Sequence, residues 1–146
     1  MPAAQEIARV HDVLDAFHAS AAAADAERHL GCLAPTMVFL GTDGGERWAG
    51  DEYREFATSY FSRGKGWAYL PSSRTVQIAA DGRTAWFDEK LENEWFGDCR
   101  GSGVLQLYDG DWKIEQYNLT IPIPNGIAAD VVASIRSSAQ PTVGDD

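Results

Sequence analysis

The sequence predicts one α+β domain in which helices near the N-terminus pack on a strongly curved antiparallel sheet and a further helix follows at the C-terminus. Two observations predict this fold class. The first part of the chain carries apolar residues at helical spacing, and the second half is rich in aromatic and β-branched residues divided by turn-forming glycines. At 146 residues the chain is long enough for one hydrophobic core. We expect residues 1–136 to form this domain and residues 137–146 to form a flexible polar tail.

The predicted helices follow from apolar residues that recur every three or four positions. Such a stripe predicts a first helix over residues 6–23. Asp25 is a suitable N-cap for a short second helix, and Pro35 is expected to end it because proline cannot continue a helix. Further stripes predict a third helix after Gly50 and a last helix after Asn125.

Five segments rich in aromatic and β-branched residues predict strands. Turn-forming pairs separate the last four of them, at Asp81-Gly82, Gly97-Asp98 and Asp109-Gly110. Asp-Gly suits a two-residue hairpin turn because both central residues need a positive φ. The last four strands are therefore expected to form a meander. The predicted strands are residues 36–40, 67–79, 84–95, 99–108 and 112–121.

The residues on each face of the predicted sheet depend on the lengths of its turns. If Gly97-Asp98 forms a two-residue turn, strand pairing places Asp88 on the face that the helices cover. A bulge or a three-residue turn would reverse this parity and place Glu89 there instead. Both carboxylates therefore stay candidates for the interior.

The two faces of the predicted sheet differ in composition. The face toward the helices would carry Gly101 and Gly103, which leave space for a ligand because they lack side chains. The opposite face would mix charged, polar and apolar side chains in the manner of a subunit interface. We expect a homodimer that packs through the outer faces of the two sheets.

Asp88 is the first candidate for a catalytic residue, and Glu89 is the alternative. A carboxyl group on an apolar surface has its charged form disfavoured, so its pKa rises and it can act as a general base near neutral pH. A structural role is the competing interpretation, in which Asp88 pairs with Arg100 or Lys90. His18 is interpreted as a packed residue, because a lone histidine on a helix is more often packed or solvated than catalytic.

Aromatic and amide side chains are the candidates for ligand binding. Aromatic rings hold a flat or apolar ligand by stacking and burial, and amides orient a carbonyl or hydroxyl group. The competing interpretation is ordinary core packing for the rings and backbone hydrogen bonding for the amides. The predicted ligand-binding residues are Trp48, Tyr60, Trp67, Trp86, Gln116 and Asn118.

Composition excludes several classes of function. Twelve Lys and Arg against 22 Asp and Glu give a net charge of −10, which repels nucleic acids and anionic membranes. Cys32 and Cys99 are too few for a disulfide framework, and their spacing does not suit a zinc site. We therefore expect both to be buried free thiols. No nucleotide or metal motif is found, and we expect no cofactor and no metal. The chain also lacks a signal-like start and an apolar run of roughly 20 residues, so a cytoplasmic location is expected.

Six short blocks of the sequence carry a resemblance to a known family. They are Gly41-Thr42-Asp43, Glu46-Arg47-Trp48, residues 64–67, residues 85–89, residues 100–105 and residues 117–122. With the order of helices and strands, they resemble the SnoaL-like domains of the nuclear-transport-factor-2-like superfamily, in a mostly uncharacterised bacterial branch. The resemblance covers about residues 6–135 and implies a cone fold, a pocket in each subunit and a homodimer.

The resemblance leaves three functions open. The leading interpretation is a small-molecule-binding domain with an apolar ligand between helices and sheet. The alternatives are a cofactor-free isomerase, cyclase or dehydratase with a pocket carboxylate as general base, and a non-catalytic dimerisation module. Catalytic or binding relatives often carry a histidine on the last strand, where this chain has Gln116 and Asn118. Amides cannot move a proton, so this departure disfavours acid–base chemistry.

Overall fold

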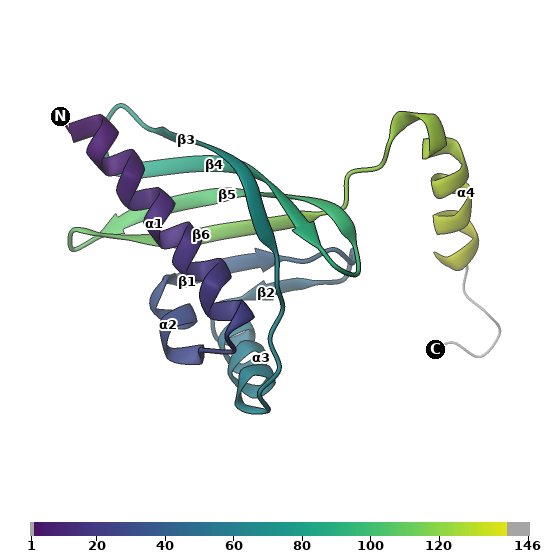
Figure 1. Cartoon of the computed structure of the whole chain (residues 1–146), viewed down its shortest axis with the longest axis horizontal. Helices are drawn as coiled ribbons and strands as arrows, with labels where there is room; N and C mark the ends of the chain where they lie inside the picture. The colour runs from purple at the N-terminus through teal and green to yellow at the C-terminus, as the bar shows by residue number, and fades with distance from the viewer. Residues whose placement is uncertain (1, 140–146) are drawn as a thin grey trace.

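The computed structural model describes residues 2–139, and it consists of helices packed on a curved six-stranded sheet (Figure 1). The predicted α+β class is confirmed. The helices are α1 (Pro2–Ala22), α2 (Ala26–Gly31), α3 (Asp51–Ser62), the 3-10 helix η1 (Asn125–Ile127) and α4 (Ala128–Ala139). The strands are β1 (Leu33–Leu40), β2 (Arg47–Ala49), β3 (Leu70–Ile78), β4 (Thr84–Asn93), β5 (Gly97–Tyr108) and β6 (Asp111–Thr120).

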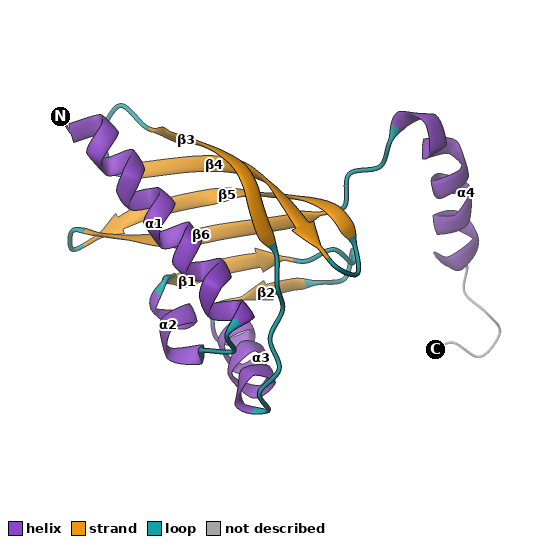
Figure 2. Cartoon of the chain, viewed as in Figure 1, coloured by secondary structure: helices purple, strands orange, loops and turns teal. Residues whose placement is uncertain are grey.

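The sheet has the strand order β2-β1-β6-β5-β4-β3 (Figure 2). Strands β3 to β6 pair antiparallel with their neighbours and form the predicted meander. Strand β1 joins β6 in parallel, which brings the N-terminal third of the chain to the far side of the meander. The three-residue β2 was not predicted, because so short an edge strand leaves almost no pattern in the sequence.

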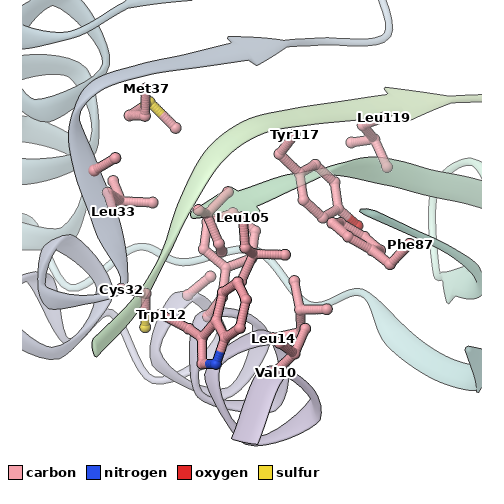
Figure 3. Packing of buried hydrophobic residues seen from close by; sticks show 14 of the residues in the cluster. Val10, Leu14, Cys32, Leu33, Met37, Phe87, Leu105, Trp112, Tyr117 and Leu119 are labelled. Atoms are coloured by element: carbon pink, nitrogen blue, oxygen red, sulfur yellow. The ribbon is translucent and has the colours of Figure 1, made fainter. Parts of the chain in front are cut away.

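Helix α1 crosses the concave face of the sheet, and its buried stripe forms the main core with β5 and β6 (Figure 3). Val10 and Leu14 are fully buried there, with Trp112 beside them. Each fully buried side chain of this size stabilises the fold by about 1.5–3 kcal/mol, so this contact holds helix and sheet together. The thiols of Cys32 and Cys99 are buried and free, as predicted.

The short second helix confirms one prediction and corrects another. The side chain of Asp25 accepts a hydrogen bond from the backbone N–H of Arg28 at 3.1 Å, so Asp25 is the N-cap of α2. Pro35 does not end this helix; it lies inside β1. The pairing of β1 with β6 is irregular between Leu33 and Val38, so a residue without an N–H is tolerated there.

The C-terminal helix lies apart from the sheet (Figure 1). It begins after the linker of residues 121–124, and its apolar residues stay largely exposed, with Ile135 at 53%. The predicted start of the polar tail falls inside α4, because residues 137–139 are helical, and residues 140–146 lie outside the described part of the chain. No helix within residues 2–139 is long and apolar enough to cross a bilayer.

The turn between β4 and β5 overturns the predicted parity of β4. Asn93 pairs with Gly97, so the loop is the three residues 94–96 and not Gly97-Asp98. The side-chain oxygen of Asn93 accepts hydrogen bonds at 2.9 Å from the backbone N–H groups of residues 95 and 96, and Gly97 takes a φ of 69°. Glu89 therefore faces the helices, and the prediction that Asp88 does so is wrong.

A bulge in β6 changes its faces as well. The predicted two-residue turn at Asp109-Gly110 is confirmed, with φ values of 51° and 85°. Farther along, Val104 pairs with Gln116 but Leu105 pairs with Ile114, so one extra residue is inserted in β6. Tyr117 and Leu119 consequently point inward, and Gln116 and Asn118 point outward, contrary to the prediction.

The two glycines of β5 serve close packing and not a ligand. A Cβ on Gly103 would overlap the backbone oxygen of Gln116, and a Cβ on Gly101 would overlap the hydroxyl of Tyr117. The expectation that these glycines leave space for a ligand is therefore wrong, because protein atoms fill that space.

We predict that Gly103→Ala lowers the free energy of unfolding by about 3 kcal/mol, because the clash with backbone atoms forces neighbouring strands apart. Urea denaturation measures this value. The control is Gly31→Ala, since a Cβ there meets nothing within 4 Å. Equal stability of the two variants would contradict the close approach at Gly103.

Candidate functional site

A buried cluster of polar side chains lies between α1 and the sheet, centred on the carboxylate of Glu89, which is only 2% exposed. His18 Nε2 lies 2.7 Å from Glu89 Oε2, and the Tyr117 hydroxyl donates to the same oxygen at 2.5 Å. Arg74 Nε donates to the other oxygen, Oε1, at 2.7 Å. Both oxygens of the carboxylate are thus engaged by the protein.

Strand register brings these groups together. Arg74 on β3 and Gly101 on β5 are the direct partners of Glu89 on either side of β4. The missing side chain of Gly101 makes room for the Tyr117 hydroxyl beside the carboxylate. His18 reaches the cluster from α1, so the cluster joins that helix to the sheet.

The surroundings keep Glu89 ionised. Burial raises the pKa of its carboxyl, but the hydrogen bonds from His18 and Tyr117 and the positive charge of Arg74 outweigh burial and hold the pKa below its ordinary value of 4.5. Burial and the nearby Glu89 charge raise the pKa of Tyr117 well above 10. A carboxylate with a lowered pKa and occupied oxygens is a weak general base.

A second buried polar group surrounds His29, which sequence reasoning did not single out. Its Nδ1 lies 3.0 Å from the backbone oxygen of Phe17 and 3.1 Å from Ser20 Oγ, and its Nε2 lies 2.7 Å from the Tyr53 hydroxyl. A carbonyl only accepts, so Nδ1 donates and Nε2 accepts from Tyr53. Burial lowers the pKa of His29 to about 4, so the ring is neutral and structural at neutral pH.

A cavity of about 240 Å³ opens at the end of the sheet near β1, β2 and α3. Its walls are mainly aromatic. Among the described residues that line it, Glu46 is the one with a charged side chain. The lining residues are Phe39, Gly41, Thr42, Glu46, Trp48, Tyr53, Phe56, Tyr60, Trp67, Tyr69, Phe96 and Leu119.

The loop between β1 and β2 sets the position of Glu46. The backbone N–H of Asp43 donates to Glu46 Oε1 at 2.9 Å. A Cβ on Gly41 would lie only 2.6 Å from the same oxygen, so this glycine lets the carboxylate lie close to the backbone. Burial, with smaller effects of Cys99 and Glu46, raises the pKa of Tyr69 to about 12, so the Tyr69 hydroxyl stays protonated.

Three of the predicted ligand-binding residues line this cavity, namely Trp48, Tyr60 and Trp67. Trp86 does not line it; this side chain lies on the outer face of the sheet, is 46% exposed and donates to Gln77 Oε1 at 2.6 Å.

The other predicted site residues that miss the cavity are Gln116, Asn118 and Asp88, which also point outward. Asp88 is exposed, so it lacks the apolar surroundings that the general-base hypothesis requires.

Glu89 faces inward but does not line the cavity; Phe39 links the two regions, because it lines the cavity and packs on Tyr117 of the cluster. The Phe39 ring lines the cavity and stacks on Tyr53 at 5.0 Å and on Tyr117 at 5.7 Å between ring centroids. The cavity therefore ends one ring away from the charged cluster.

Sequence reasoning missed the residues that give each region its charge. Arg74 lies in a predicted strand without a distinguishing pattern, and Glu46 belongs to one of the blocks that carry the family resemblance. The alternation of β4 was an available signal for Glu89, since Phe87 and Leu91 share its face while Asp88 does not. Within residues 2–139 no three His, Cys, Asp or Glu side chains gather to hold a metal ion.

Comparison with protein families identifies the domain type. A sequence model of the SnoaL-like domain matches residues 10–124. No curated protein sequence matches the chain.

Solved structures share the fold at low sequence identity. An NTF2-like protein from Streptomyces avermitilis, whose description suggests a dehydratase, has a TM-score of 0.70 and 11% identity, covering 84% of this chain and 99% of that chain. An uncharacterised protein with a cystatin-like fold from Caulobacter vibrioides has a TM-score of 0.70 and 16% identity, covering 89% and 99%. A protein from Novosphingobium aromaticivorans, whose description suggests an aromatic ring hydroxylase, has a TM-score of 0.69 and 19% identity, covering 83% and 92%. These descriptions differ, so the shared fold does not define one chemistry.

We predict that Glu89→Gln lowers the free energy of unfolding by about 3–5 kcal/mol at neutral pH, because it breaks the buried ion pair with Arg74 and leaves that guanidinium only the largely exposed carboxylate of Asp15. The folded pKa of Glu89 lies below the ordinary 4.5, so its contribution is fully present above pH 4.5 and is lost as pH falls through the folded pKa. The difference in the free energy of unfolding between the wild type and Glu89→Gln should therefore shrink below pH 4.5. Urea denaturation from pH 3 to 7 measures both effects.

His29 provides an internal control for this experiment. Its pKa is about 4 when folded and 6.5 ordinarily, so the unfolded chain takes up the proton first and stability falls between pH 6.5 and 4. This loss should be the same in wild type and in Glu89→Gln. A difference between the two proteins that does not shrink as the pH falls below 4.5 would contradict the assignment to Glu89.

Proposed function

Because the chain belongs to the family of SnoaL-like domains and contains a cavity lined mainly by aromatic rings, we propose that it binds a small, mostly apolar molecule in this cavity. The observation that carries the proposal is the gathering of Trp48, Tyr60 and Trp67 from separate segments around one space. Aromatic walls with a few polar groups are typical of small-molecule sites.

The size of the cavity limits the ligand. Sites for drug-sized ligands usually have volumes of about 300–1,000 Å³. At about 240 Å³ this cavity lies just below that range. It therefore suits a molecule with a single ring or a compact branched group.

A cofactor-free isomerase, cyclase or dehydratase is the second candidate function, and the His18–Glu89 pair is the observation that favours it. A histidine oriented by a carboxylate is a common acid–base arrangement. Binding is supported better, because the oxygens of Glu89 are occupied and neither His18 nor Glu89 lines the cavity.

We predict that the single-ring probe p-cresol binds in the cavity and that Trp48→Ala weakens its binding about tenfold. The reason is the loss of one aromatic wall, since an aromatic contact is worth about 1 kcal/mol beyond its buried area. Amide chemical shifts in a titration by NMR measure the affinity and show where the probe lies.

The control for this titration is Trp86→Ala, which removes an exposed tryptophan from the outer face of the sheet, away from the cavity. Its affinity for p-cresol should equal that of the wild type. Shifts scattered over the molecule, or an equal loss in both variants, would contradict binding in the cavity. Absence of any binding would favour the dimerisation module.

We further propose that two copies of the chain form a homodimer through the outer faces of their sheets. Trp86, Val104 and Gln116 lie side by side there, in register across β4, β5 and β6. An exposed tryptophan beside an aliphatic residue is typical of the centre of an interface.

We predict that Val104→Glu converts the homodimer to a monomer of 15.9 kDa, because it places an unpaired charge at the centre of the interface. Light scattering after size-exclusion chromatography measures the mass. The control is Thr58→Glu on α3, an exposed position that adds the same charge away from the outer face. A wild-type protein that is already monomeric would refute the dimer.

A further inference from the structure

We infer that the ligand of the cavity is an organic cation whose nitrogen carries alkyl groups, and that Glu46 and the aromatic walls select it. This inference rests on the proposed binding function and adds the chemical class of the ligand. It depends on the charge, the rings and the size of the cavity.

The charge of the cavity is purely negative. Glu46 lines it, and none of the lining residues is a lysine, arginine or histidine. Of the two carboxylate oxygens of Glu46, Oε1 accepts a hydrogen bond from the backbone N–H of Asp43. Oε2 accepts none from residues 2–139, so it is left for a ligand. A neutral apolar ligand would cover this carboxylate without pairing it, which costs free energy. An anionic ligand would be repelled by it and by the net charge of −10.

The rings of the cavity form one aromatic wall. Trp48 and Phe56 stack at 4.8 Å between centroids, and Phe56 and Trp67 lie 5.8 Å apart, both pairs with ring planes within 20° of parallel. The face of an aromatic ring attracts cations, and the face of tryptophan attracts them most strongly.

A cation already lies against one ring of the wall. The guanidinium carbon of Arg63 lies 5.5 Å from the centroid of the Tyr60 ring. Arg63 is exposed and does not line the cavity, so it occupies the ring from outside. The contact has the geometry of a cation–π interaction.

Alkyl groups on the nitrogen fit the cavity better than a bare ammonium. Of the twelve lining residues, nine are aromatic or aliphatic, so most of the ligand surface would meet apolar atoms. A bare ammonium holds its water strongly and would lose it here, whereas methyl groups spread the charge over an apolar surface. A volume of about 240 Å³ is enough for a trimethylammonium group with a short chain.

The test compares choline with 3,3-dimethylbutan-1-ol, its neutral isostere in which carbon replaces the charged nitrogen. Both are titrated into the full chain at low ionic strength and followed by NMR and calorimetry. We expect choline to bind about tenfold or more tightly than the isostere, which corresponds to one desolvated cation–π contact assisted by a carboxylate. Equal affinities would overturn the inference.

The variant Glu46→Gln tests the carboxylate alone. Glutamine keeps a side-chain oxygen that can accept from Asp43, so the loop is retained while the charge is lost. We expect the preference for choline to fall about threefold or more, with no change for the isostere. The matched control is Glu52→Gln, because Glu52 also accepts from a backbone N–H, that of Ala49, but lies outside the cavity. An unchanged preference in Glu46→Gln would refute the role of Glu46.

The p-cresol titration separates the two levels of the proposal. If p-cresol binds in the cavity and choline shows no preference over its isostere, the cation is refuted and the binding function stands. If p-cresol, choline and the isostere all fail to bind, the binding function is refuted together with the inference.

Discussion

The buried carboxylate of Glu89 is the interaction on which the arrangement of helix and sheet depends. Removing a carboxylate from water costs several kcal/mol unless charged and hydrogen-bonding partners replace the water. Here the partners come from three other elements, with His18 on α1, Arg74 on β3 and Tyr117 on β6. Because β5 must also leave room for the tyrosine, Gly101 is part of the same constraint. The apolar core supplies most of the stability, and this cluster sets how α1 lies across the sheet.

The cluster also determines where a ligand can bind. The cluster occupies the space between α1 and the sheet, and the aromatic cavity lies beside β1, β2 and α3. The ring of Phe39 lines the cavity and packs on Tyr117, so it connects the cavity with the charged cluster. The cavity keeps a single carboxylate, Glu46, in an aromatic surrounding, and this gives it a chemical preference that the fold alone does not imply.

Much of the fold was predictable from local patterns, whereas the candidate site was predictable only in part. Some features depend only on residues that are close together in the sequence, and these predictions are confirmed. They are the helical stripes, the cap at Asp25 and the Asp109-Gly110 turn. Trp48 and Trp67, proposed as ligand-binding residues because aromatic rings hold apolar ligands by stacking and burial, lie at the wall of one cavity. The faces of β4 were predicted wrongly, because an assumed turn length was given more weight than the alternation of apolar residues along the strand.

The sequence by itself determined the α+β class, the order of the helices and meander strands, the negative net charge and the stock of aromatic side chains. Only the tertiary structure decided that Glu89 and not Asp88 lies inside, and that Glu46 reaches a cavity. The physical reason is that side chains alternate with a period of two along a strand, so one residue in a loop or bulge reverses every face beyond it. Hydrogen bonds across strands set those single-residue shifts, and they join residues that are far apart in the sequence.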